Sequence, residues 1–228
     1  MIKIVVDCFG GDHSPKANVD GALAALSKTP DLFIVLTGDE SLLREELDGK
    51  EYDASRLEIV HAPDIIGCDE RPIDAVRLKR DSSMIKAVRM LRDMDDVHAI
   101  VSTGSTGALV AAALTRVGRL RGVIRPAFCP VLPTMDGGIV GICDSGANVE
   151  VTPDHLRQFA IMASLYMERT YGVKSPRVAL LNVGKEAEKG DEIRQVAYKL
   201  LEETPEINFV GNMESRDLLS GSYDVVVC

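Results

Sequence analysis

The sequence predicts an α/β fold of three layers, in which helices cover both faces of a mostly parallel β-sheet. Short apolar runs of strand length alternate along the chain with amphipathic segments of helix length. This alternation is typical of parallel sheets whose strands are connected through helices. No internal repeat, low-complexity tract or disordered linker interrupts the 228 residues. We therefore expect residues 1–228 to form a single α/β domain.

The expected strands are short runs rich in β-branched and other apolar residues. They span residues 2–7, 32–37, 57–60, 98–101, 127–131, 139–143, 177–182, 207–210 and 224–227. Residues 126–143 break the alternation, because two strand patterns there flank the turn Met135-Asp136-Gly137-Gly138. That arrangement predicts a local hairpin inserted in the α/β order.

The expected helices are the amphipathic segments between these strands. They lie near residues 16–27, 40–47, 82–93, 105–117, 153–170, 190–203 and 214–219. Thr152 and Pro153 begin one of them as N-cap and first-turn proline, and Gly172 ends it. Residues 108–114 are apolar all round, so we expect a central, buried helix there.

The chain stops at the end of a predicted core strand, residues 224–227. α/β proteins seldom stop at that point, where the ligand-binding edge of the sheet lies. We therefore expect the chain to be truncated at its C-terminal end.

Composition and charge narrow the class of protein. Hydrophobic residues make up 46% of the chain and charged residues 27%, which is ordinary for a soluble globular protein. The longest strongly apolar helical stretch, residues 108–114, is far shorter than the roughly 20 residues that span a bilayer. The chain starts in a strand pattern, not in a signal peptide. No C-x-x-C spacing occurs among the cysteines, which we interpret as reduced core thiols of a cytoplasmic protein: Cys8, Cys68, Cys129, Cys143 and Cys228.

The net charge of −9 argues against nucleic-acid binding. Basic residues nevertheless gather between residues 71 and 92, where they could steer an acidic partner or simply form solvated helix faces. These residues are Arg71, Arg77, Lys79, Arg80, Lys86, Arg89 and Arg92.

Two glycine-rich turns each follow a predicted strand directly and precede a helix pattern. One is Cys8-Phe9-Gly10-Gly11-Asp12-His13, and the other is Ser102-Thr103-Gly104-Ser105-Thr106-Gly107. Exposed backbone N–H groups and the positive end of a helix dipole suit an anion such as phosphate. Because such turns meet at one edge of a parallel sheet, we expect an anion site there. The ordinary alternative is that the glycines serve only tight turns.

Polar loops also follow two later strands. Asp144 and Asn148 come after residues 139–143, while Asn182, Lys185 and Lys189 come at and after the end of residues 177–182. Asp144 could instead be an Asx-turn residue, and the lysines could be surface charges. The sequence contains no Walker or dinucleotide motif, no metal-ligand cluster and no G-x-S-x-G elbow. We therefore expect neither a cofactor nor a bound metal.

Eight colinear motifs resemble those of the PlsX family, the bacterial phosphate acyltransferases of phospholipid synthesis, from residue 1 to residue 228. They are Gly10-Gly11-Asp12-His13-Ser14-Pro15, Asp81-Ser82-Ser83-Met84, Ser102-Thr103-Gly104-Ser105-Thr106-Gly107-Ala108, Arg125-Pro126-Ala127, Leu132-Pro133-Thr134, Asp144-Ser145-Gly146-Ala147-Asn148, Leu181-Asn182-Val183-Gly184 with Lys189-Gly190, and Gly211-Asn212-Met213-Glu214 with Arg216-Asp217.

The resemblance implies transfer of a fatty acyl group from acyl carrier protein to inorganic phosphate, giving acyl phosphate. It also implies a homodimer, loose association with the membrane, and a fold similar to phosphate acetyltransferases and isopropylmalate dehydrogenases. This sequence departs from the family pattern at Ser105, where asparagine is usual, and at Ser145, where an aliphatic residue is usual. It departs again at Lys185 and Ala187.

The chemistry of such a transfer suggests the role of each candidate residue. A leaving thiol with a pKa of about 8.5 departs largely as thiolate, so the hard steps are positioning two anions and stabilising the oxyanion. We predict direct attack by bound phosphate, with covalent relay through Cys8 or Cys143 as the alternative. The candidate substrate-binding residues are Gly10, Gly11, Asp12, His13, Ser102, Gly104, Ser105, Thr106, Gly107, Asn148 and Asn182. The candidate catalytic residues are Lys189, Lys185 and Asp144, and the candidate carrier-protein dock is Arg71, Arg77, Lys79, Arg80, Lys86 and Arg89.

Three other functions fit parts of the sequence. One is a short-chain phosphate acyltransferase that uses acyl-coenzyme A. Another is an inactive module that binds acyl carrier protein. The third, a nicotinamide dehydrogenase of related fold, lacks a dinucleotide fingerprint.

Overall fold

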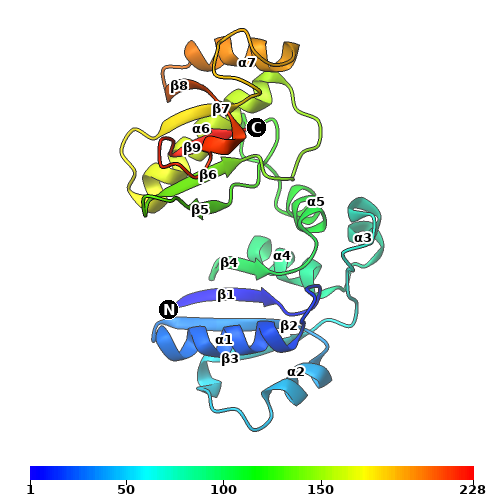
Figure 1. Ribbon diagram of the computed structural model, residues 1–228. Helices are drawn as coiled ribbons and strands as arrows, with labels where there is room; N and C mark the ends of the chain where they lie inside the picture. Colours follow the sequence, from blue (N-terminus) through cyan, green and yellow to red (C-terminus); the bar gives the residue numbers. More distant parts are fainter. The chain divides into compact units, whose positions relative to one another are not determined.

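The computed structural model describes residues 1–228 and divides them into two compact units. Unit 1 is residues 1–118 and unit 2 is residues 119–228. Each unit has its own mostly parallel sheet, whereas the sequence led us to expect one sheet (Figure 1). The α/β class is confirmed, and the single domain stays a prediction. Along the chain, residues 117–130 connect the elements of the two sheets and form no strand or helix, and Gly118 and Gly122 there have positive φ angles.

Unit 1 is built on a four-stranded parallel sheet in the order β3-β2-β1-β4. Its strands are β1 (Ile2–Asp7), β2 (Leu32–Gly38), β3 (Leu57–His61) and β4 (Val97–Ser102). Its helices are α1 (Lys16–Lys28), α2 (Glu40–Leu47), α3 (Pro72–Leu78), α4 (Ser83–Asp93) and α5 (Thr106–Arg116), with a 3-10 turn at Ala54–Arg56.

Helices cover both faces of this sheet because its side chains alternate in direction along each strand. Val6 and Ile34 pack into a core with Leu26 of α1 and Leu43 of α2. Val5 and its neighbours on the other face pack against α4. Unit 1 therefore has the three layers that the sequence predicts.

Helix α5 differs from its prediction. Only Ala108 and Ala112 are fully buried, in a core shared with α3 and α4. Leu114 is 37% exposed and Val117, which follows the helix, is 48% exposed. The expectation of a helix buried all round is therefore wrong, because an alanine-rich segment shows no polar face by which its exposed side could be recognised.

Unit 2 has a five-stranded sheet in the order β5-β6-β9-β7-β8, parallel except where β5 pairs with β6. Its strands are β5 (Val131–Pro133), β6 (Ile139–Cys143), β7 (Arg177–Leu181), β8 (Asn208–Met213) and β9 (Val225–Val227). Its helices are α6 (Pro153–Tyr171) and α7 (Glu192–Glu202), and Ser215–Asp217 is only a 3-10 turn where a helix was predicted.

The antiparallel hairpin β5–β6 is confirmed, but its first strand was predicted at residues 127–131, four residues too early. Residues 126–128 instead lie along the loop after β6, and only at Pro130 does a carbonyl accept from β6, from the Ile142 N–H at 3.0 Å. In that loop, the Phe128 N–H donates to Asp144, and the Ser145 N–H donates to the Phe128 carbonyl at 2.9 Å. This pairing with a loop replaces the sheet pairing that the apolar pattern predicts.

Helix α6 begins and ends where predicted. The His155 N–H donates to the Thr152 hydroxyl, and Nδ1 of His155 accepts from the Thr152 N–H, which makes a capping box. Gly172 ends the helix in the left-handed conformation, at φ 71°. Phe159 of α6 and Leu201 of α7 pack on the same face of the unit 2 sheet. On the opposite face, Leu218 and Tyr223 pack against the sheet residues Val140, Ala179 and Val226.

Replacing Gly21 of α1 with alanine is expected to stabilise the folded protein. A Cβ added there would meet no heavy atom within 4 Å, so Gly21→Ala should raise the free energy of unfolding by about 0.5–1 kcal/mol. Urea denaturation measures the change. Gly38→Ala is the matched control, because its Cβ would collide with the Phe9 ring and should destabilise the chain instead. Stabilisation by both substitutions would contradict the packing described here.

Candidate functional site

The two glycine-rich turns of unit 1 lie side by side. They follow β1 and β4, which are parallel neighbours with Asp7 opposite Ser102. A Cβ on Gly10 would lie 3.1 Å from the Gly104 Cα, and Gly10 has a φ of 138°. Only glycine fits this close backbone approach without strain. The gathering of these turns at one sheet edge is therefore confirmed.

Asp7 is the buried centre of both turns. One carboxylate oxygen accepts from the Ser102 hydroxyl at 2.7 Å, and the other accepts from the Phe9 N–H at 3.3 Å. The Ser102 hydroxyl oxygen in turn accepts from the Gly104 N–H at 3.1 Å. Sequence analysis missed Asp7, although an acid that ends an otherwise apolar strand is a usable signal.

Burial raises the pKa of Asp7 above its ordinary value, which gives a pH-dependent stability. The folded state then holds the proton more tightly than the unfolded state, where the pKa is about 3.9. The free energy of unfolding should fall as pH rises from about 4 through the raised pKa, and remain low above it. Asp7→Asn should flatten this slope in urea titrations between acidic and neutral pH. Parallel curves for wild type and variant would contradict the burial of an ionisable carboxyl.

Free backbone amides remain at these turns. Ser105 caps α5, since its hydroxyl accepts from the Ala108 N–H at 3.3 Å. The N–H groups of Thr106 and Gly107 have no protein acceptor, nor do those of Gly11, Asp12 and His13. Such amides, at the start of a helix in the case of α5, can hold an anion.

The side chains of Asp12 and His13 are exposed and form no hydrogen bond within the chain. They are therefore free to contact a ligand at the turn.

The candidate carrier-docking residues differ in whether their side chains already form hydrogen bonds within the chain. The Lys79 ammonium donates to Glu70 and to the Ile65 carbonyl, both at 2.6 Å, and the Lys86 ammonium donates to the His61 carbonyl. These two lysines therefore hold the fold together. Arg71, Arg77 and Arg80 are exposed, and Arg89 is half-buried.

Asp144 organises the loop after β6 in unit 2. Its carboxylate accepts from the Phe128 N–H and from the Asn148 N–H, both at 2.6 Å, and from the Asn148 side-chain amide at 3.2 Å. The same amide donates to the Pro126 carbonyl at 2.9 Å. Since both oxygens of this buried carboxylate are occupied, the geometry favours the loop-forming alternative over direct catalysis for Asp144.

Asn182 closes the loop after β7. Its side-chain amide donates to the Lys189 carbonyl at 2.9 Å, and its oxygen accepts from the Val183 N–H at 2.8 Å. Gly190, at φ 91°, packs directly against the Asn182 side chain, where a Cβ would collide. The predicted residues Asn182 and Lys189 are thus brought together, through the Lys189 backbone.

The two candidate lysines of this loop differ. Lys185 forms an ion pair with Asp217 at 2.7 Å, and the carboxylate raises the pKa of Lys185. The Lys189 ammonium has no ion-pair or hydrogen-bond partner in the chain. Lys189 is therefore the cation available to an anionic ligand.

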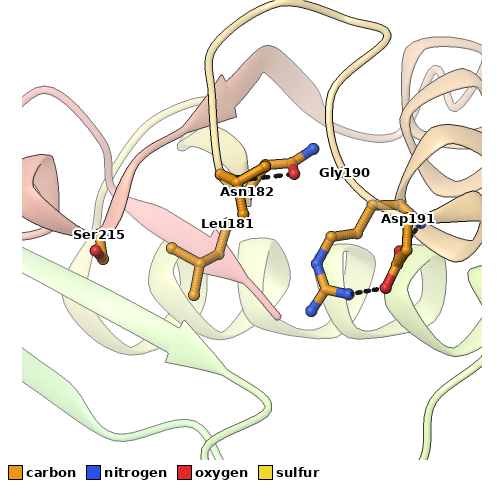
Figure 2. A pocket seen from close by; sticks show the side chains of 7 residues that line it. Leu181, Asn182, Gly190, Asp191 and Ser215 are labelled. Carbon is orange, nitrogen blue, oxygen red and sulfur yellow. Dashed lines mark hydrogen bonds and ion pairs between the residues drawn. The ribbon is translucent and has the colours of Figure 1, made fainter.

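A pocket of about 560 Å³ opens beside this loop (Figure 2). Asn182, Gly190, Asp191, Arg194 and Ser215 are among its lining residues. Asp191 caps α7 by accepting from the Arg194 N–H at 2.9 Å, and it pairs with the Arg194 guanidinium at 2.7 Å. Asp191, Arg194 and Ser215 were not among the residues predicted from sequence. Asp191 could have been found, because an aspartate before an amphipathic segment is a usable N-cap signal.

The cysteines near the strand ends are core thiols. Cys8 and Cys143 are fully buried. Burial raises the pKa of Cys8 to about 12, and a hydrogen bond with Cys129 together with burial raises the pKa of Cys143. Both thiols are therefore protonated near neutral pH, which favours direct attack by phosphate over covalent relay.

Comparison with known sequences identifies the family. The profile of the family described as "Fatty acid synthesis protein" matches residues 2–228. A protein named phosphate acyltransferase from Bacillus cereus (strain B4264) is 48% identical over 227 residues, which are 100% of this chain and 67% of that protein. The phosphate acyltransferase of Bacillus anthracis is 47% identical, with the same coverage.

The chain belongs to this family of phosphate acyltransferases. Solved structures agree with the family's fold. A phosphotransacetylase from Streptococcus pyogenes has a TM-score of 0.71 at 16% identity, covering 99% of this chain and 76% of that one. The EutD phosphotransacetylase from Staphylococcus aureus has a TM-score of 0.67 at 19% identity, covering 99% of this chain and 77% of that one. A putative 4-hydroxythreonine-4-phosphate dehydrogenase from Salmonella typhimurium, at 15% identity, has a TM-score of 0.53. The match covers 99% of this chain and 80% of that one.

Proposed function

We propose that the chain transfers a fatty acyl group from acyl carrier protein to inorganic phosphate, giving acyl phosphate for phospholipid synthesis. Membership of the phosphate acyltransferase family supports the reaction. The observation that carries the proposal is the pair of adjacent turns with free backbone amides in unit 1, ordered by Asp7. They offer the N–H donors that an anionic nucleophile requires.

In the reaction, an oxygen of bound phosphate attacks the thioester carbonyl carbon. The new carbon–oxygen bond forms first and gives a tetrahedral oxyanion. As the oxyanion collapses, the carbon–sulfur bond breaks and the carrier leaves as thiolate, which takes up a proton from solvent while the phosphate group releases one. The amides of Thr106 and Gly107, with the Thr106 hydroxyl, hold phosphate in this scheme. In unit 2, Lys189 is our candidate for the cation that offsets negative charge on the reactants, because its ammonium has no partner in the chain.

Three polar residues of unit 2 shape the loops that follow its strands. Asp144 and Asn148 keep the loop after β6 in shape, and Asn182 keeps the Lys189 loop closed. Lys185, held by Asp217, contributes less to the charge on the ligand.

Charge complementarity supports docking of the acidic carrier protein near α3. Arg71, Arg77 and Arg80 are exposed there, beside Ile73 and Leu78, which are 75% and 77% exposed. Pro72 at the start of α3 packs against Gly107, where a Cβ would come within 2.9 Å. The docking face therefore adjoins the turn that holds phosphate.

A homodimer, a cytoplasmic location and loose contact with the membrane surface complete the proposal. The resemblance to the family supports the homodimer and the membrane contact, and the free cysteines support the cytoplasmic location. None of the structure's helices combines the length and the apolar character that crossing a membrane requires.

The test is phosphate-dependent formation of acyl phosphate from long-chain acyl carrier protein, with acyl-coenzyme A compared in the same panel. We expect product from the carrier-bound substrate and little from the coenzyme-bound one. The reverse preference would favour the short-chain alternative. Carrier binding with no product from either donor would favour the inactive binding module.

Thr106→Ala should lower turnover on the order of 10- to 100-fold, because a hydrogen bond to a charged group contributes about 1.5–3 kcal/mol. Thr115→Ala, on the same helix, is the matched control. Its hydroxyl donates to the Ala111 carbonyl within α5, so turnover should not change. Equal turnover of the Thr106 variant and wild type would remove Thr106 from the site.

A further inference from the structure

The motif Asp81-Ser82-Ser83-Met84 lies where α4 begins, and the function proposed above gives it no role. Ser82, Ser83 and Met84 are each at most 1% exposed, although two of them are polar. Buried polar side chains need hydrogen-bond partners inside the protein. The partners of the two serines therefore indicate what each one does.

Ser82 serves its own helix. Its hydroxyl oxygen accepts from the Ile85 N–H at 3.4 Å, as the N-cap of α4. The Ser82 side chain forms no hydrogen bond with either glycine turn. Its role is therefore confined to the start of α4.

Ser83, the next residue, contacts the first glycine turn. Its hydroxyl donates to the Phe9 carbonyl at 3.3 Å. That carbonyl and the Gly10 N–H belong to one planar peptide unit, so the hydrogen bond orients the unit as a whole. The free N–H groups of residues 11–13 follow directly after it. Ser83 therefore fixes the backbone from which these donors extend.

The backbone of Ser83 is itself held on two sides. Its carbonyl accepts from the buried Thr37 hydroxyl at 3.0 Å, and its N–H donates to the Asp64 carbonyl at 3.2 Å. Burial raises the pKa of Asp7, and hydrogen bonds from Ser83 and Ser102 counteract part of that rise. The Ser83 hydroxyl is thus also within reach of the acid that orders both turns.

Met84 contacts the second glycine turn. A Cβ added to Gly104 would lie 3.1 Å from the Met84 methyl carbon, so this side chain packs directly against Gly104. Ala108 of α5 belongs to the same buried core as Met84. The free N–H groups of residues 106 and 107 lie between these two contacts along the chain. Met84 therefore supports the second turn from below.

We propose that Ser83 and Met84 are positioning residues of the phosphate site, which set the two glycine turns at a fixed spacing. The inference rests on the proposed function, which places phosphate at those turns. Adjacent residues of one helix contact one turn each, so the first turn of α4 links the two sets of free amides. Neither side chain contacts phosphate in this scheme, because both act through the backbone of the turns.

Phosphate binding tests the proposal without any turnover. The melting temperature is measured against the concentration of inorganic phosphate, with sodium chloride holding the ionic strength constant, and the rise gives a dissociation constant. Ser83→Ala removes the hydroxyl that holds the Phe9 carbonyl. The dissociation constant for phosphate should rise by about 2- to 10-fold, as for the loss of one neutral hydrogen bond.

Ser82→Ala is the matched control, since Ser82 is the buried neighbour that caps α4. It should lower the melting temperature without phosphate and leave the dissociation constant unchanged. Met84→Ala should weaken phosphate binding, because it leaves a cavity below Gly104. Met84→Leu, which nearly conserves the side-chain volume, should restore binding to near the wild-type value.

Three results would overturn the proposal. One is an equal dissociation constant in wild type and in Ser83→Ala. Another is equal weakening in Ser82→Ala and Ser83→Ala, which would assign the effect to general loss of stability. The third is a melting temperature of wild type that does not respond to phosphate.

Steady-state kinetics on the same variants separate this inference from the proposed function. Ser83→Ala should raise the KM for phosphate by the same factor and leave the KM for acyl carrier protein unchanged. Turnover with an unchanged KM for phosphate would overturn the positioning role and leave the function standing. Weaker phosphate binding by Ser83→Ala, in a chain that forms no acyl phosphate, would support the positioning role and contradict the function.

Discussion

Replacing Asp144 with alanine is expected to lower the free energy of unfolding by about 2–5 kcal/mol. The Asp144 carboxylate accepts from the Phe128 N–H and the Asn148 N–H, both at 2.6 Å. Alanine leaves these part-buried donors without an acceptor, and each unsatisfied group costs about 1–3 kcal/mol. Urea denaturation followed by circular dichroism measures the loss.

Two variants show that the effect comes from these hydrogen bonds. Asp144→Asn keeps one acceptor oxygen and should lose less stability than Asp144→Ala. Ser145→Ala, at an exposed neighbouring residue, should leave stability almost unchanged. If Asp144→Ala were as stable as wild type but inactive, Asp144 would be a catalytic residue and the loop-forming role would be wrong.

Replacing Lys189 with alanine is expected to lower the rate of acyl phosphate formation by about 10²- to 10³-fold, as expected for loss of one group that stabilises developing charge. The Lys189 ammonium is exposed and has no partner in the chain, so it is free to meet an anion. The substitution should leave stability almost unchanged, since the Asn182 side chain holds the Lys189 backbone carbonyl.

Lys185→Ala and Lys174→Ala are the comparisons. Lys185 is held by Asp217 at 2.7 Å, so its loss should reduce the rate less than the loss of Lys189. Lys174, exposed at the other end of β7, should have no effect. A larger loss from Lys185→Ala than from Lys189→Ala would reverse the assignment of the two lysines.

Much of the fold could be predicted because local signals agree with the final structure. Short apolar runs located β1 and β2 within one residue, and the Thr152 and Gly172 caps marked both ends of α6. Helix α3 was missed because its seven residues are too few to show a period. The division into two sheets was also missed, since strand pairing depends on long-range contacts that no local pattern records.

The candidate site was predicted in part, for similar reasons. Gly10 and Gly104 could be placed at one sheet edge, because parallel strands bring their following turns together. The roles of Asp7 and Asp144 could not be read from sequence, because both depend on which backbone N–H groups lie nearby in the fold. Lys185 and Lys189 look alike in sequence, and only the position of Asp217 distinguishes them.

Direct attack by phosphate is the central claim, and one experiment measures it most directly. The chain is mixed with long-chain acyl carrier protein, first without phosphate and then with it, while carrier thiol release and the intact mass of the chain are followed. The account predicts neither thiol release nor acylated protein until phosphate is added, and then one acyl phosphate for each thiol released. An acylated chain formed without phosphate, at Cys8, Cys143 or elsewhere, would contradict it.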